Sequence, residues 1–137
     1  MQTALTFDTF ISLVVAVILG GIVGVERELA HRPAGLRTHM MVSLGSCLFT
    51  IVSIGFSTDP ARIAAGIVAG IGFIGAGTIW AEKDKVRGIT TAASLWATAA
   101  IGLTAGIGDY PLATAVTLLV CIILLSKYVF RKLGIEQ

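Results

Sequence analysis

Charged side chains are scarce in this chain of 137 residues, and so are histidine and cysteine. Charged residues make up 13% of the sequence, about half of the ~25% usual for a soluble domain, while apolar residues make up 55%. A soluble domain of this length needs far more polar surface to cover its core, so lipid is the expected solvent. The length fits one domain, and a second globular domain is not expected.

The few reactive side chains argue against several kinds of site. Cys47 and Cys121 lie in apolar runs and match no metal or redox spacing, so we expect both to be small buried residues. His31 and His39 lack the spacing of a zinc site, and a solvated surface position is expected for both. No serine has a base identifiable nearby, and the basic residues form short clusters rather than a nucleic-acid stripe. We therefore expect neither an enzyme nor a resident cofactor.

Five apolar stretches are each close to the ~20 residues that cross ~30 Å of hydrocarbon. The first nine residues carry no lysine or arginine, and no small-residue cleavage site follows, so the first stretch is expected to be a retained helix rather than a signal peptide. The predicted fold is all-α, a single polytopic bundle of about five transmembrane helices over residues 1–137. The predicted helices are residues 7–25, 39–56, 62–81, 91–107 and 111–130.

Lysine and arginine alternate between the two ends of these helices. Nine of the ten fall around the first connection, the third connection or the C-terminal tail, and only Arg62 falls on the other side. The positive-inside rule assigns the crowded side to the cytoplasm, so the N-terminus is predicted outside and the C-terminus in the cytoplasm of a bacterial cell. The nine residues are Arg27, Arg32, Arg37, Lys83, Lys85, Arg87, Lys127, Arg131 and Lys132.

Small residues are concentrated in the third and fourth predicted helices, and at Gly20 and Gly24 of the first. Such residues at four-residue spacing let helix backbones approach closely in lipid. We therefore expect the first, third and fourth helices to form the packed centre, and the Leu-, Ile- and Val-rich fifth helix to face lipid. Trp96 is expected to be a packing residue in the fourth helix. The surplus of small-residue surface predicts a homodimer or a higher homo-oligomer.

Two patterns involve glycine in other ways. Residues 70–75 (GIGFIG) spell a dinucleotide-binding fingerprint, but they lie in an apolar span without a preceding strand, so helix packing is the better interpretation. A second pattern recurs at an offset of 53 residues, and either duplication of a helix pair or coincidence between glycine-rich segments explains it. Its members are Gly24, Gly35, Leu36 and Thr38, which recur as Gly77, Gly88, Ile89 and Thr91.

Charged residues near the helix ends allow two interpretations each. Glu26 is either a structural ion-pair partner of Arg37 or Arg87, or a functional carboxylate at the membrane boundary. Asp59 is expected to cap the third helix, with Pro60 in its first turn and Arg62 within pairing distance. Alternatively, Asp59 is a carboxylate at the outer mouth that attracts a cation.

The most distinctive stretch is residues 32–39 (RPAGLRTH). It is expected to form a Pro/Gly turn whose arginines lie at anionic headgroups and whose Thr38 caps the second helix. With two arginines, two histidines and two glutamates close together, the same region also has the composition of a docking or proton-sensitive surface.

Taken together, these segments resemble the MgtC/SapB family of bacterial inner-membrane proteins, over about residues 10–130. The resemblance lies in five ordered motifs: residues 24–28 (GVERE), 32–39 (RPAGLRTH), 59–63 (DPARI), 70–79 (GIGFIGAGTI) and 86–96 (VRGITTAASLW). The chain stops seven residues after Phe130, which resembles the membrane-only form, so functions of a C-terminal soluble domain are not expected of it.

The resemblance implies a multi-pass plasma-membrane protein that regulates Mg²⁺ or proton homeostasis, or membrane energetics, through a membrane partner such as the ATP synthase. The alternative is an oligomeric transporter or channel for Mg²⁺ or another cation, with Mg²⁺ as ligand or transported ion. The candidate functional residues are those of the motifs: Glu26, Arg27, Arg32, Arg37, Thr38, His39, Asp59, Arg62, Gly75, Gly77, Arg87, Thr90, Thr91 and Trp96.

Overall fold

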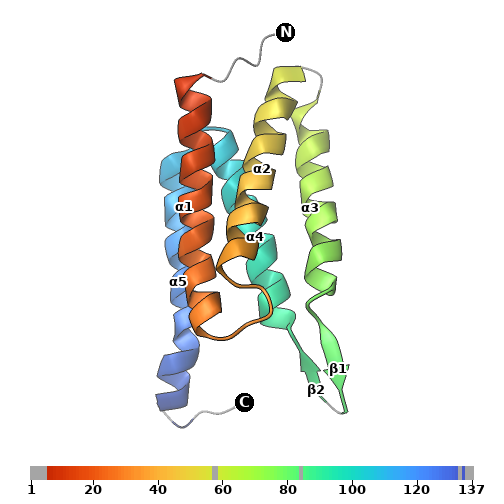
Figure 1. Cartoon of the computed structure of the whole chain (residues 1–137), viewed down its shortest axis with the longest axis vertical. Coiled ribbons are helices and arrows are strands. Elements are labelled where there is room, and N and C mark those ends of the chain that lie inside the picture. The colour runs from red at the N-terminus through yellow and green to blue at the C-terminus, as the bar shows by residue number, and fades with distance from the viewer. Residues whose placement is uncertain (1–5, 57–58, 84, 133, 135–137) are drawn as a thin grey trace.

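A computed structural model describes residues 6–56, 59–83, 85–132 and 134, and within them it contains five helices and one short hairpin (Figure 1). The predicted all-α fold is thereby confirmed. Four of the helices (α1, α2, α4 and α5) are long and apolar enough to cross a membrane, and α3 is a shorter apolar helix. In chain order the elements are α1 (Phe7–Leu29), α2 (Leu36–Phe56), α3 (Pro60–Ala76), β1 (Trp80–Glu82), β2 (Lys85–Arg87), α4 (Ile89–Gly106) and α5 (Tyr110–Lys132).

The predicted end of the third helix, at residue 81, is wrong. Helix α3 ends at Ala76, and residues 80–82 pair with residues 85–87 in an antiparallel hairpin, with Trp80 opposite Arg87. Gly88 closes this hairpin with a left-handed φ of +92°, and a side chain there would overlap the carbonyl oxygen of Thr78. The apolar residues 79–81 therefore do not continue the helix. Gly77 and Gly88, on either side of the hairpin, favour turns over helix.

Helix starts are set by local hydrogen bonds, and one of them differs from expectation. Asp59 caps α3 by accepting a hydrogen bond from the backbone N–H of Ala61 at 3.1 Å, as predicted. Thr38 does not cap α2, because that helix begins two residues earlier, at Leu36. The N–H of Leu36 instead donates to the carboxylate of Glu28 at 2.9 Å, so the end of α1 supplies the cap of α2.

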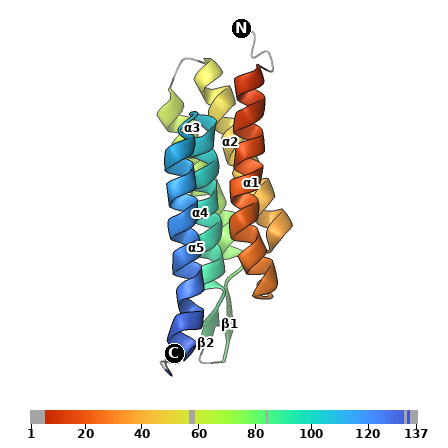
Figure 2. The same ribbon diagram turned by 90° about the vertical axis from the view of Figure 1, so that its left-hand side faces the viewer.

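Helices α1, α2 and α4 form the packed centre, and α5 lies against α1 and α4 (Figure 2). The expectation that α3 rather than α2 is central is wrong. Small residues reveal which helices can approach a neighbour but not which neighbour they meet, and α2 contributes its own small face of Ser43, Cys47 and Thr50. At three glycines of α3, an added Cβ would meet nothing within 4 Å: Gly66, Gly70 and Gly72.

The charged residues separate along the bundle axis. The end of α1, the start of α2, the hairpin and the end of α5 lie together at the lower end of the bundle in Figure 1, which we call the basic end. Asp8, Asp59 and Asp109 belong to the starts of α1, α3 and α5 at the other end. The alternation inferred from the sequence is therefore a property of the fold, and the assignment of the basic end to the cytoplasm stays a prediction.

Exposed apolar side chains cover the outside of the bundle. Helix α5 exposes Leu118, Leu119, Ile122 and Ile123, which agrees with its expected lipid-facing position. Trp96 is 54% exposed, so its expected packing role is wrong. Helix α4 turns Leu95 and Thr98 inward, and Trp96, between them in sequence, points out of the bundle.

The helix starts follow the offset of 53 residues seen in the sequence. Helices α1 and α3 begin at Phe7 and Pro60, and α2 and α4 begin at Leu36 and Ile89. Both pairs of starts are therefore separated by the same 53 residues. This agreement supports duplication of a helix pair, with the second copy replacing the last turns of its first helix by the hairpin.

Candidate functional site

Two glycines of α1 bring the polar residues of the basic end together. A Cβ added at Gly24 would lie 2.7 Å from the Cα of Leu36, and one added at Gly20 would lie 2.8 Å from the carbonyl oxygen of His39. Helices α1 and α2 are thus in backbone contact just where their polar ends meet. The contact places Glu26 and Arg27, in the turn after Gly24, beside the first turns of α2.

Glu26 and Arg27, in the last turn of α1, form an ion pair with each other. The side chain of Arg27 is 3% exposed and that of Glu26 is 11% exposed. The expected pairing of Glu26 with Arg37 or Arg87 is wrong, because those arginines lie on the exposed surface while Arg27 points inward. Among the described residues, the second carboxylate oxygen of Glu26, Oε1, is buried and has no hydrogen-bond partner.

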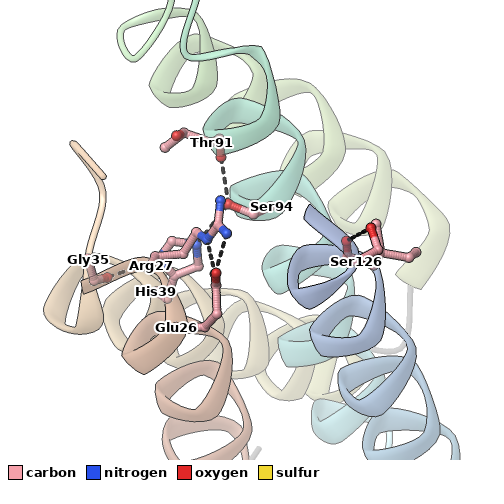
Figure 3. A network of polar contacts seen from close by, with 8 residues as sticks. Glu26, Arg27, Gly35, His39, Thr91, Ser94 and Ser126 are labelled. Atoms are coloured by element: carbon pink, nitrogen blue, oxygen red, sulfur yellow. Dashed lines mark hydrogen bonds and ion pairs between the residues drawn. The ribbon is translucent and has the colours of Figure 1, made fainter. Parts of the chain in front are cut away.

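His39 is fully buried and connects three segments of the chain (Figure 3). Its Nδ1 lies 2.9 Å from the carbonyl oxygen of Gly35, and its Nε2 lies 3.1 Å from the hydroxyl of Ser94 on α4. The Ser94 hydroxyl also donates to the carbonyl oxygen of Thr91 at 2.8 Å. The expected solvated position of His39 is wrong because α2 starts earlier than predicted, which places this residue in the bundle rather than in the turn.

When the imidazole of His39 is neutral, only two hydrogens are available for these three contacts. A carbonyl oxygen only accepts, so Nδ1 of His39 carries the proton that faces Gly35. Nε2 is then an acceptor, and the single hydrogen of Ser94 faces two acceptors, Nε2 and the carbonyl oxygen of Thr91. A second proton on the imidazole would satisfy all three contacts. The hydrogen bonds between α2 and α4 therefore depend on the protonation state of His39.

The turn before α2 forms a separate polar pocket of about 410 Å³ on the surface of the basic end. A side chain at Gly35 would displace the carboxylate of Glu28, which caps α2. Arg32 and Arg37 are exposed and line this pocket together with Thr38. These three predicted residues are thus close to one another but separate from the buried cluster of Glu26, Arg27 and His39.

The remaining predicted residues lie elsewhere. Arg87 pairs with Glu82 at 3.0 Å on the exposed hairpin, and Asp59 and Arg62 lie at the far end of the bundle. Gly75 approaches Ala92, where an added Cβ would lie 3.4 Å from the Ala92 Cβ. The other four are Gly77 at the end of α3, Thr90 and Trp96 on exposed positions of α4, and Thr91, which is buried and joins the His39 cluster through its carbonyl oxygen.

Sequence reasoning named Thr91 but missed the other buried hydroxyl groups, of which Ser94 is the most important. The signal was available as periodicity, since hydroxyl residues recur every three or four positions on both α2 and α4. They are Ser43, Ser46, Thr50 and Ser53 on α2, and Thr91, Ser94 and Thr98 on α4, and all of them are buried. Within the residues that the structure describes, no group of three or more His, Cys, Asp or Glu side chains could hold a metal ion.

Comparison with known proteins places this geometry in a family. The MgtC family model matches residues 13–133. The chain belongs to the MgtC family. It is 45% identical over 120 residues to Protein MgtC of Salmonella typhimurium strain LT2, covering 87% of this chain and 52% of that protein. It is also 45% identical over 129 residues to the Putative magnesium transporter YhiD of Escherichia coli K12, covering 85% of this chain and 60% of that protein.

Two further findings belong to this comparison. The chain spans about half to three fifths of the length of the curated relatives that it matches. No solved structure matches it. Membership of the MgtC family, together with four apolar helices long enough to span a membrane, makes this chain a multi-pass protein of the bacterial inner membrane.

Proposed function

We propose that this MgtC-family chain regulates Mg²⁺ and proton homeostasis, or the energetics of the membrane, through a partner protein. The observation that carries this proposal is the backbone contact among α1, α2 and α4 along the bundle. A side chain at Gly102 would overlap the carbonyl oxygen of Ser43, and one at Gly106 would lie 2.8 Å from that of Cys47. At these glycines and at Gly20 and Gly24, the helix backbones are in contact. This contact leaves no space inside one chain for an ion conduit.

The buried cluster gives such a regulator a means of responding to the proton. His39 lies in the first turn of α2 and the Glu26–Arg27 pair in the last turn of α1, at the basic end of the bundle. A change in the charge of His39 would alter the hydrogen bonds between α2 and α4, and therefore the fit of the two helices. The resemblance of the motifs implies a proton-driven partner such as the ATP synthase, and the exposed apolar face of the bundle offers a partner membrane-embedded surface.

We also propose that the working form is a homodimer or a larger homo-oligomer. The face of α3 that points away from the bundle carries small, exposed residues spaced four, three and four apart: Ala65, Ala69, Gly72 and Ala76. In lipid, such a face allows two helices to approach closely. Cysteines placed at Ala69 should cross-link between subunits, whereas cysteines at Leu119 on α5 should not.

The alternative function is an oligomeric transporter or channel for Mg²⁺ or another cation. One relative bears the name of a putative magnesium transporter, and the buried, unpartnered Oε1 of Glu26 is an oxygen ligand of the kind that Mg²⁺ prefers. A conduit would then have to run between subunits, since the centre of each bundle is filled.

Ion flux into liposomes containing the purified protein separates the two functions. A regulator gives no Mg²⁺ or proton flux under any gradient, while deletion of its gene changes cytosolic pH, membrane potential or growth in low magnesium. Glu26→Gln should reproduce the deletion phenotype, and the matched control Glu82→Gln, which removes an exposed carboxylate on the hairpin, should not. Flux that disappears in Glu26→Gln but persists in Glu82→Gln would favour the transporter.

A further inference from the structure

Helices α2 and α3 enclose a groove that the packed centre of the protein does not use. It has a volume of about 590 Å³ and runs along α3 from Arg62 to Ile74. Its walls are apolar side chains and glycines, apart from Ser46 and the single charged residue Arg62 at one end. The groove opens on the lipid-facing side of the bundle, because Phe49 of its α2 wall is 60% exposed.

Three glycines line this groove without bringing two helix backbones into contact. A Cβ added at Gly45, Gly66 or Gly70 would meet nothing within 4 Å, in contrast to Gly24 and Gly106 in the packed centre. Glycine is unfavourable inside a helix, so three of them beside a hollow call for a reason other than packing within this chain. Side chains at these positions would fill the hollow.

The length and width of the groove fit a hydrocarbon chain. Arg62 and Ile74 are twelve residues apart on α3, or about 18 Å along the helix, which is close to one leaflet of a hydrocarbon core ~30 Å thick. Spread over about 18 Å, a volume of 590 Å³ gives a mean cross-section of about 33 Å². An extended acyl chain is much narrower than a helix ~10 Å across and can lie along a groove of this length.

Arg62 supplies a matching charge at the mouth. It is exposed, and among the ion pairs of the described residues it takes part in none. Asp59, the nearest carboxylate in sequence, is occupied as the cap of α3. The nine other lysines and arginines belong to the basic end of the bundle, in the opposite leaflet. A guanidinium binds phosphate through two parallel hydrogen bonds.

We propose that the α2–α3 groove is a binding site for one anionic phospholipid, with an acyl chain between Gly45, Gly66 and Gly70 and the lipid phosphate on Arg62. The phosphate end of the site, at Arg62, lies at the opposite end of the bundle from the His39 cluster, and the site does not depend on the proposed regulatory function. A bound lipid would complete the contact between α2 and α3 that the side chains leave unmade.

Quenching by brominated lipid tests this site directly. In a variant with Trp80 and Trp96 replaced by phenylalanine, a single tryptophan is introduced as Phe49→Trp in the groove, or as Leu119→Trp on the lipid-facing side of α5. Each protein is placed in phosphatidylcholine vesicles with an increasing fraction of phosphatidylglycerol brominated on its acyl chains. Quenching of the groove tryptophan should saturate at a fraction several-fold lower than quenching of the α5 tryptophan, because the site concentrates the anionic lipid.

Variants of the groove complete the experiment. Arg62→Gln should move the groove curve toward that of Leu119→Trp by about tenfold in lipid fraction, as expected for a lost charge-assisted hydrogen bond. Lys132→Gln, at the basic end, should leave the curve unchanged. Gly70→Leu should lower the maximal quenching, and Gly66→Ala serves if the larger side chain prevents folding. Coinciding curves for Phe49→Trp and Leu119→Trp would overturn the proposal, and weaker quenching in the groove would assign it to a second copy.

Discussion

The Nε2 atom of His39 on α2 lies 3.1 Å from the hydroxyl oxygen of Ser94 on α4, in a position where both side chains are buried. The two residues are 55 positions apart in sequence, and their contact joins the two halves related by the internal repeat. A polar contact between helices in the same bundle fixes their rotation as well as their distance. It is the point at which the protonation of one side chain can change how the halves fit.

Removing the Ser94 hydroxyl should therefore loosen the bundle. Ser94→Ala leaves the imidazole of His39 with a buried nitrogen that has lost its partner, and the expected cost is about 0.5–2 kcal/mol, the range for polar contacts between helices in membranes. Thermal unfolding of the purified protein in mild detergent measures the change. Thr90→Ala, an exposed position on the same helix, should unfold at the same temperature as the unchanged protein.

The pH dependence of stability should follow from the same cluster. Because the hydrogen bonds around His39 depend on its protonation, the unfolding temperatures of the unchanged protein and of Ser94→Ala should differ in how they depend on pH. His31→Gln, at an exposed position in the turn, is the matched control. Identical pH profiles for Ser94→Ala and the unchanged protein would show that the His39 cluster does not sense protons.

The glycines divide into two classes with opposite expected effects. Gly102→Ala should destabilise the protein by about 1–3 kcal/mol, because the new methyl group would overlap the backbone of α2 at Ser43. Gly66→Ala should be neutral or stabilising by up to about 1 kcal/mol, since alanine favours helix and the position is open. Unfolding of the two variants in the same detergent compares them, and equal effects would contradict the central placement of α2.

Much of the fold follows from composition and periodicity alone. A run of about twenty apolar residues indicates a membrane-spanning helix whatever surrounds it, which is why α1, α2, α4 and α5 were predictable. The hairpin was not, because Ile79, Trp80 and Ala81 are as apolar as a helix end. Gly88, whose positive φ closes the hairpin, was noted in the sequence only as part of a repeat.

The candidate site was harder to predict, because its members are brought together by helix packing. Glu26, Arg27 and His39 were recognised as unusual, but their burial depends on Gly20 and Gly24 contacting α2. Sequence spacing gives the face of a helix on which a residue lies, and it does not give the partner of that face. Ser94 was overlooked for this reason, although its spacing from Thr91 and Thr98 marks a hydroxyl face.

The Glu26–Arg27 pair should be costly to break on one side only. Arg27→Met would leave a buried carboxylate without its partner, and the expected loss is about 3 kcal/mol or more of unfolding free energy. The double variant Arg27→Met with Glu26→Gln should recover a large part of that loss because it removes both charges. Arg87→Met breaks an ion pair on the exposed hairpin, and its expected effect is ~0–1 kcal/mol. An equal loss from Arg27→Met and Arg87→Met would contradict the burial of the first pair.

The orientation of the bundle can be read from two positions on opposite ends. Lys83, in the turn of the hairpin, belongs to the basic end, and Asp109, just before α5, belongs to the other end. Because lysine and arginine are retained on the cytoplasmic side, Lys83→Cys should react with a membrane-impermeant maleimide only after the cells are opened. Asp109→Cys should react in intact cells whose outer membrane has been made permeable. Cys47 and Cys121 are replaced by alanine beforehand, so that only the introduced thiol is labelled. Labelling of both positions from the same side would require a different number of membrane crossings, and the reverse pattern would turn the bundle over and place the His39 cluster outside the cytoplasm.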